Sequence, residues 1–279
     1  MENKKIKALL FSPDKRNQAI AWELDKSTNN GELRKALEEE YAELMQLLEM
    51  DIETLMLQTE IVISFKGLTT LPSIPPNIQS LHCEFNLLTE LPELPNIKRL
   101  ICYGNELTKL PNLPSIQDLN CNSNQLTQLP QFFNLKELNC ASNQLKFLPE
   151  LPNVIRLCCY DNQLTQLPKL PNVQELHCYM NQLKSLPQLP NIQELHCSRN
   201  HLTQLPELAN IKELACHKNE LTELPKLLGV QKLDCSHNQL VQLPELPKVQ
   251  KLNCTNNQLV KLPTLPNIQE LKCDDYLKE

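Results

Sequence analysis

Apolar and polar positions recur along most of the chain with a fixed period of nineteen residues. Each unit reads close to I-x-x-L-x-C-x-x-N-x-L-T-x-L-P-x-L-P-N, and the Leu column that starts at Leu81 has no substitutions. Segments such as Leu176-His177-Cys178 alternate apolar and polar residues, which is typical of a short strand with one buried face. The pattern therefore predicts one short strand in every unit.

Stacking of such units predicts the architecture. Successive strands would lie parallel and about 4.8 Å apart, forming a curved sheet on the concave side of a solenoid. Each circuit leaves roughly ten residues for the return path, and two of these are usually proline, which breaks helices and holds its neighbour extended. We therefore expect an extended or polyproline-like convex side without regular helices.

The repeat resembles a known family. Its unit is similar to the leucine-rich repeat L-x-x-L-x-L-x-x-N-x-L, with Cys in the third apolar position. The L-P-x-L-P segment resembles the LPX subclass of bacterial leucine-rich repeats, which includes YopM-type scaffold effectors and IpaH-type ubiquitin-ligase effectors. The resemblance covers about three quarters of the chain and implies a leucine-rich-repeat solenoid that binds proteins.

The N-terminal residues 1–57 have a different pattern. Ser12 and Pro13 are typical of a helix start, and apolar residues then recur near helical spacing. The apolar side expected for this helix consists of Ala19, Ile20, Trp22 and Leu24. Because the end of a solenoid exposes an apolar cross-section, we expect residues 1–57 to form an α-helical cap, with a docking element as the alternative.

Residues 58–279 are expected to hold about ten 19-residue repeats plus degenerate terminal coils. Ile61 and Ile63 align with the Leu81 and Cys83 positions and indicate a degenerate first coil. At the other end, Tyr276 replaces the repeated Asn, and the charged residues around it suggest a polar end to the last coil.

Eleven cysteines occupy one position of the repeat. In this frame they point inward, where a thiol behaves as a small apolar filler, so packing is favoured over disulfides, metal or catalysis. The members of the column are Cys83, Cys102, Cys121, Cys140, Cys159, Cys178, Cys197, Cys216, Cys235, Cys254 and Cys273. Cys273-Asp274-Asp275 matches the C-x-D letters of the IpaH-type nucleophile, but only six residues follow Cys273, so no ubiquitin-ligase domain and no enzymatic activity are expected.

Charge and hydropathy limit the partners. The net charge of −6 gives no basic field for nucleic acid, and no apolar run approaches the ~18 residues of a membrane span. Twelve thiols fit a reducing compartment, so we expect a cytoplasmic protein, in the bacterial cytosol or in a host cytosol after delivery.

The candidate protein-binding residues lie at the variable positions of the concave face. They combine aromatic, Arg, His and Met side chains, and aromatics and Arg are enriched in binding hot spots. These candidates are Tyr103, Tyr160, His177, Tyr179, Met180, His196, Arg199 and His217. Metal binding by His177 and His196 beside Glu175 and Glu194 is conceivable, but a flat sheet face should bring them together poorly, so no metal or cofactor is expected.

Two functions are compatible with these residues. The first is a non-catalytic protein-binding scaffold or adaptor that uses the concave face, such as a bacterial effector. The second is a substrate-recognition subunit or fragment that serves a separate enzyme such as a ubiquitin ligase. Both predict a protein partner and a monomer, and the sequence does not separate them.

Overall fold

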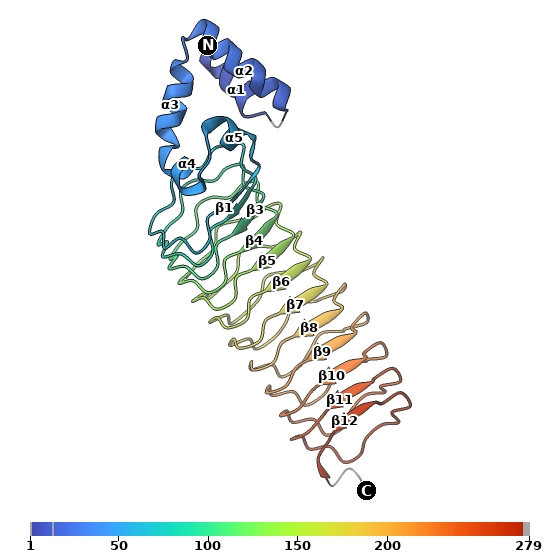
Figure 1. Ribbon diagram of the computed structural model, residues 1–279. Helices are drawn as coiled ribbons and strands as arrows, with labels where there is room; N and C mark the ends of the chain where they lie inside the picture. Colours follow the sequence, from blue (N-terminus) through green and yellow to red (C-terminus); the bar gives the residue numbers. More distant parts are fainter. Residues whose placement is uncertain (1, 13, 276–279) are drawn as a thin grey trace. The chain divides into compact units, whose positions relative to one another are not determined.

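The computed structural model describes residues 2–12 and 14–275. Contacts between Cα atoms divide the chain into two compact units, Met1–Asn124 and Gln125–Glu279. In the described residues the first unit holds helices α1 to α5 and strands β1 to β4, and the second holds strands β5 to β12 (Figure 1). The predicted division between residues 57 and 58 stays a prediction, because the first unit contains both helices and repeats.

The N-terminal part is helical, which confirms the predicted cap. The helices are α1 Glu2–Leu10, α2 Lys15–Thr28, α3 Glu32–Glu40, α4 Ala42–Leu48 and α5 Ile52–Leu57. Helix α1 was not expected, and the residues that follow α2 form three short helices, α3, α4 and α5. Glu49, in the left-handed conformation with φ 54°, ends α4.

The start and the buried face of α2 both differ from the prediction. Asp14, and not Ser12, is the N-cap, because its carboxylate accepts a hydrogen bond from the Arg16 N–H at 2.8 Å. The buried side chains of α2 are Gln18, Ala21 and Asp25, whereas Ile20 is 51% exposed. The Asp25 carboxylate accepts from the Leu33 and Arg34 N–H groups at the start of α3, which explains why a charged residue is buried here.

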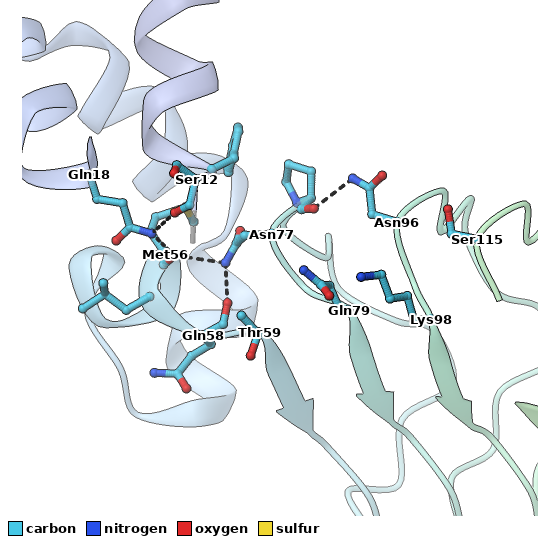
Figure 2. A pocket seen from close by; sticks show the side chains of 13 residues that line it. Ser12, Gln18, Met56, Gln58, Thr59, Asn77, Gln79, Asn96, Lys98 and Ser115 are labelled. Atoms are coloured by element: carbon cyan, nitrogen blue, oxygen red, sulfur yellow. Dashed lines mark hydrogen bonds between the residues drawn. The ribbon is translucent and has the colours of Figure 1, made fainter. Parts of the chain in front are cut away.

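Amide side chains join the helices to the first repeat (Figure 2). Gln18 Nε2 donates to the carbonyls of Ser12 and Met56, both at 2.8 Å. Asn77 Nδ2 donates to Met56 at 3.1 Å and to Gln58 at 2.7 Å. The last carbonyls of a helix lack partners within the helix, and these two amides supply them for α5.

The repeats build parallel sheets. In the first unit the strands are β1 Glu60–Val62, β2 Ser80–His82, β3 Arg99–Ile101 and β4 Asp118–Asn120. In the second unit they are β5 Glu137–Asn139, β6 Arg156–Cys158, β7 Glu175–His177, β8 Glu194–His196, β9 Glu213–Ala215, β10 Lys232–Asp234, β11 Lys251–Asn253 and β12 Glu270–Lys272. Within each unit the strands follow chain order, and Ile61 pairs with Leu81, which confirms the degenerate first coil. The expected polar end at Tyr276 lies outside the described residues.

Leucine and cysteine columns form the core of the array. The Leu at the centre of each strand is buried from β2 to β11, and all eleven cysteines of the column are buried. All twelve cysteines are free thiols, and Cys158, which faces away from the column, is the half-buried exception. Burial raises the pKa of thiols such as Cys121 and Cys197 to about 12, so they remain uncharged fillers.

An asparagine ladder closes each turn out of the sheet. Asn162 Nδ2 donates to the carbonyls of Cys140 at 3.1 Å and Cys159 at 3.2 Å, and its Oδ1 accepts from the Leu145 N–H at 2.9 Å. The same pattern recurs one coil later at Asn181. Each amide thus satisfies backbone groups of its own coil and the preceding one.

A second asparagine ladder lies on the return path, and the sequence analysis missed it. Asn191 Nδ2 donates to the Pro171 carbonyl of the preceding coil at 2.8 Å, and Asn172 donates in the same way to Pro152 at 2.8 Å. Asn191 also sits in a turn closed by the Ile192 N–H to Leu189 O bond of 3.3 Å. The repeated L-P-N triplet was the available signal. Between β1 and β12 the described chain contains no helix, as predicted for the convex side.

The residue two positions after each column cysteine from Cys83 to Cys254 adopts the left-handed conformation. Most of these residues are not glycine, although an L side chain costs about 1–2 kcal/mol in this region. The set is Phe85, Gly104, Ser123, Ser142, Asp161, Met180, Arg199, Lys218, His237 and Asn256, with φ between 49° and 66°. The backbone turn is therefore imposed by the repeat and not by the residue that occupies it.

The first prediction concerns the buried ladder. Replacing Asn162 by Leu keeps the bulk but removes the acceptor of the Leu145 N–H and one of the two amide donors to each of the Cys140 and Cys159 carbonyls, so we expect a loss of ~1–3 kcal/mol. Because a repeat contacts only its neighbours, faster hydrogen exchange should be confined to the adjacent coils. The matched control is Asn172→Leu in the same coil, whose exposed amide makes one bond. Equal exchange in the two variants would contradict the role assigned to Asn162.

The second prediction concerns the thiols. Burial, followed by the charges of Glu175 and Glu194, raises the pKa of Cys158 to about 11, so little of it is the reactive thiolate at neutral pH. Iodoacetamide should modify Cys158 alone in the folded protein, and the reaction should be slow. Its rate should rise about tenfold for each pH unit from about 7.5 to 9.5, because the thiolate fraction rises by that factor below the pKa. Mass spectrometry locates the modified residue, and unfolding should release the other thiols. Comparable labelling of Cys178 in the folded protein would show that the reagent can reach the cysteine column.

Candidate protein-binding site

The concave face is formed by the side chains that flank the buried Leu of each strand and by the two residues after each column cysteine. Leu176 and Cys178 are buried, whereas Glu175, His177 and Tyr179 between and beside them are half-buried. The alternation arises because successive side chains of a strand point to opposite faces. Seven of the eight predicted binding residues belong to the second unit, where they lie at the ends of β7 and β8 or two to three residues after one of the strands β6 to β9.

Two tyrosines form an aromatic platform. The rings of Tyr160 and Tyr179 are stacked, with centroids 4.4 Å apart and an angle of 6° between their planes. Burial, followed by the neighbouring Tyr160, raises the pKa of Tyr179 to about 12, so the Tyr179 phenol is neutral. The stack arises because the two residues occupy one repeat position on neighbouring coils.

Two histidines form a second stack beside it. The rings of His177 and His196 have centroids 4.4 Å apart and lie 5° from parallel. Nε2 of His177 lies 3.0 Å from Glu194 Oε1, and Nε2 of His196 lies 3.5 Å from Oε1 of both Glu194 and Glu213. The expectation that a flat sheet face brings these groups together poorly was wrong. In-register strands set the side chains side by side, and no convergence from opposite directions is needed.

A shallow groove next to the tyrosines gathers most of the candidates. Its volume is about 470 Å³, and its lining consists of Tyr179, Met180, His196, Ser198, Arg199, Ala215 and His217. Burial lowers the pKa of His217, which therefore presents a neutral imidazole at pH 7. Ser198 and Ala215 were missed by the sequence analysis, because small side chains carry no hot-spot signal although they form the groove floor.

Tyr103 belongs to the first unit and has a different environment. Its ring contacts Phe85 edge to face at 4.9 Å, and Phe85 stacks on Phe65 at 4.5 Å. Phe65 and Phe85 are 71% and 45% exposed. This second aromatic row was missed, because Phe65 lies in the degenerate coil where the repeat frame is hard to assign.

Ion pairs cross the strands at the position before the central Leu. Arg156 Nη1 lies 2.6 Å from Glu137 Oε1 on one side, and its Nε lies 3.5 Å from Glu175 Oε2 on the other. Lys232 Nζ lies 2.7 Å from Glu213 Oε2. The candidate surface is therefore edged by charges of both signs.

Comparisons with known proteins agree with this geometry. The family model described as Leucine Rich repeats (2 copies) matches residues 171–210. YopM from Yersinia enterocolitica is 29% identical over 94% of this chain and 70% of its own, with a TM-score of 0.54. The chain contains leucine-rich repeats and is similar to bacterial proteins of the YopM type.

A second solved structure bears on the cysteines of this leucine-rich-repeat protein. The functional domain of InlJ from Listeria monocytogenes, described as including a cysteine ladder, is 26% identical with a TM-score of 0.72. The alignment covers 83% of this chain and 58% of that one. A search of curated proteins found no significant match.

The Cys273 position is a member of the buried cysteine column and is 6% exposed. Burial of this kind fits a packing role for Cys273 and not that of a nucleophile. No helix among residues 2–12 and 14–275 combines the length and the apolar character needed to cross a bilayer.

The third prediction tests whether the Met180 side chain, which lines the groove, contributes to the stability of the fold. Its side chain is 42% exposed and its φ is 55°, so Met180→Gly removes the side chain and relieves the left-handed backbone. We expect a stability equal to the wild type or higher by up to ~1 kcal/mol, measured by urea unfolding. Met180→Ala is the control, since it removes the side chain and keeps the strain. A Met180→Ala protein much less stable than the wild type would show that the thioether stabilises the fold, and a Met180→Gly protein less stable than Met180→Ala would contradict the strain assigned to this position.

Proposed function

We propose that this protein is a non-catalytic protein-binding scaffold that captures its partner on the concave face of the second unit. The observation that carries the proposal is the parallel stack of Tyr160 and Tyr179 beside the groove. The leucine-rich-repeat fold supports protein binding, and the stack supports the proposal that the binding surface is centred on Tyr160 and Tyr179.

The chemistry of the surface favours a protein over nucleic acid. Stacked tyrosines offer a large apolar area with few rotatable bonds, and Arg199 and Met180 add residue types that are enriched at protein interfaces. A single strand of nucleic acid could stack on the tyrosines, but Glu175, Glu194 and Glu213 would repel its phosphates. The proposed partner therefore presents apolar and hydrogen-bonding groups to a platform with an acidic edge, and it binds one copy of the chain.

The likeness to YopM supports a bacterial effector role. The free thiols support work in a reducing compartment, the cytosol of the bacterium or that of a host cell after delivery. An effector of this kind acts by bringing partners together, which needs surface and no reacting group.

The fourth prediction tests the tyrosine platform. Partners captured from bacterial and host lysates are identified, and the affinity of the best one is measured for the double variant Tyr160→Ala, Tyr179→Ala. Each hot-spot truncation costs ~2 kcal/mol or more, so affinity should fall roughly a hundredfold or further. Both rings lie outside the core, so the melting temperature should stay near that of the wild type.

The matched control is Phe133→Ala, Phe147→Ala in the same unit. These rings are 73% and 53% exposed and lie on return segments, so their loss tests nonspecific adhesion of aromatic groups. Full binding by the tyrosine variant would contradict the proposal. Loss of binding in Ile20→Ser, Leu24→Ser instead would identify α2 as the recognition element, because both side chains are exposed there.

A further inference from the structure

Three glutamates in register lie next to the tyrosine platform. Glu175, Glu194 and Glu213 pair directly with one another across β7, β8 and β9. Like charges on adjacent strands destabilise a sheet unless a cation lies between them. Positive charge at this place would therefore stabilise the sheet.

Side-chain cations reach only the outer two glutamates. Arg156 lies 3.5 Å from Glu175, and Lys232 lies 2.7 Å from Glu213. In the part of the chain that the structure describes, the ion-pair contacts of Glu194 are to His177 and His196. The central carboxylate thus has no Lys or Arg within contact distance, and two imidazole rings surround it.

The ligand atoms of these three residues lie close together. One atom each from His177, Glu194 and His196 falls within 4.8 Å of the other two. The closest pair is His177 Nε2 and Glu194 Oε1 at 3.0 Å. All three side chains are half-buried, so modest rotations of the rings can shorten these separations toward the roughly 3.3 Å between ligands of a tetrahedral ion with ~2.0–2.1 Å bonds.

One of the histidine nitrogens lacks a partner. Nε2 of His196 is buried and makes no hydrogen bond, although Oε1 of Glu194 and Oε1 of Glu213 both lie at 3.5 Å. A neutral imidazole has one N–H and cannot serve two carboxylates, whereas its lone pair can bind a cation that the carboxylates also contact. A cation between them would therefore satisfy both the unpaired nitrogen and the central glutamate.

We propose that His177, His196 and Glu194 form a binding site for a divalent transition-metal ion of the zinc class. Two imidazole nitrogens and one carboxylate oxygen are a ligand set that Zn²⁺ takes, with a fourth position for water or for another group. Mg²⁺ and Ca²⁺ prefer oxygen ligands throughout, so they fit this set poorly. Glu175 and Glu213 flank the ion and add to the negative field that attracts it.

The half-buried thiol nearby is not part of the set. Cys158 Sγ lies 3.8 Å from Nδ1 of His177, the ring nitrogen opposite the one that faces Glu194. Its contact orients the ring so that Nε2 points to the carboxylate. The bound ion would join β7 to β8 through side chains, in addition to the backbone bonds that already pair them.

The experiment is titration of the reduced full chain with Zn²⁺ by calorimetry, with Mg²⁺ and Ca²⁺ as comparison ions. We expect one Zn²⁺ per chain and no measurable heat from Mg²⁺ or Ca²⁺. His177→Ala, His196→Ala and Glu194→Gln should each weaken Zn²⁺ binding by about tenfold or more, since each removes one ligand, a change of roughly 1.4 kcal/mol or more. Glu194→Gln keeps the size of the side chain, so it covers the case in which a histidine variant folds poorly.

Two matched controls keep the result specific. His201→Ala removes a histidine that contacts a glutamate, Glu220, at 3.2 Å on its own, and it should bind Zn²⁺ like the wild type. Cys158→Ser should do the same, because the thiol lies on the other ring nitrogen. Nitrogen chemical shifts should move at Nε2 of His177 and His196 on addition of Zn²⁺.

Two outcomes would overturn the proposal. One is the absence of Zn²⁺ binding, and the other is stoichiometric Zn²⁺ that persists in the double variant His177→Ala, His196→Ala, which would place the ion on the thiols. Neither outcome bears on partner capture by the tyrosines, since the titration uses metal alone.

Discussion

The need to satisfy backbone polar groups where the chain leaves the sheet governs this structure. A strand of three residues pairs few groups by itself, and every coil then turns sharply through a left-handed residue. The amide of the repeated Asn answers this need from one fixed position, since it bonds the carbonyls of two coils and one N–H. Register, coil spacing and the inward direction of the leucines all follow, because any slip would break these bonds at the same time.

The repeat array could be predicted from the sequence because a pattern that recurs at a fixed interval is compatible with one architecture. When Leu, Cys and Asn return at the same interval, only a stack of parallel strands places every copy in the same environment. The N-terminal helices offered no such repetition. The burial of Gln18 and Asp25 on α2, with Ile20 left exposed, depends on carbonyl and N–H groups of other helices, which no local pattern reveals.

The sequence predicted which repeat positions form the candidate site, but not which side chains contact one another there. The sequence placed Tyr160 and Tyr179 at one repeat position, and the structure shows their rings in parallel contact. The relation between His177, His196 and Glu194 was discounted, because proximity on a flat sheet is set by strand register and side-chain length together. Small residues such as Ala215 line the groove and leave space because their side chains are short, and residue type alone does not predict such a groove.

The left-handed position after each cysteine has an evolutionary consequence. Residues as unlike as Phe85, Asp161, Met180 and Lys218 occupy it with nearly the same φ. The backbone therefore keeps this conformation whichever side chain is present. Mutation can change the chemistry displayed at this row while the turn keeps its geometry, so new binding specificities can arise there without a compensating change in the core.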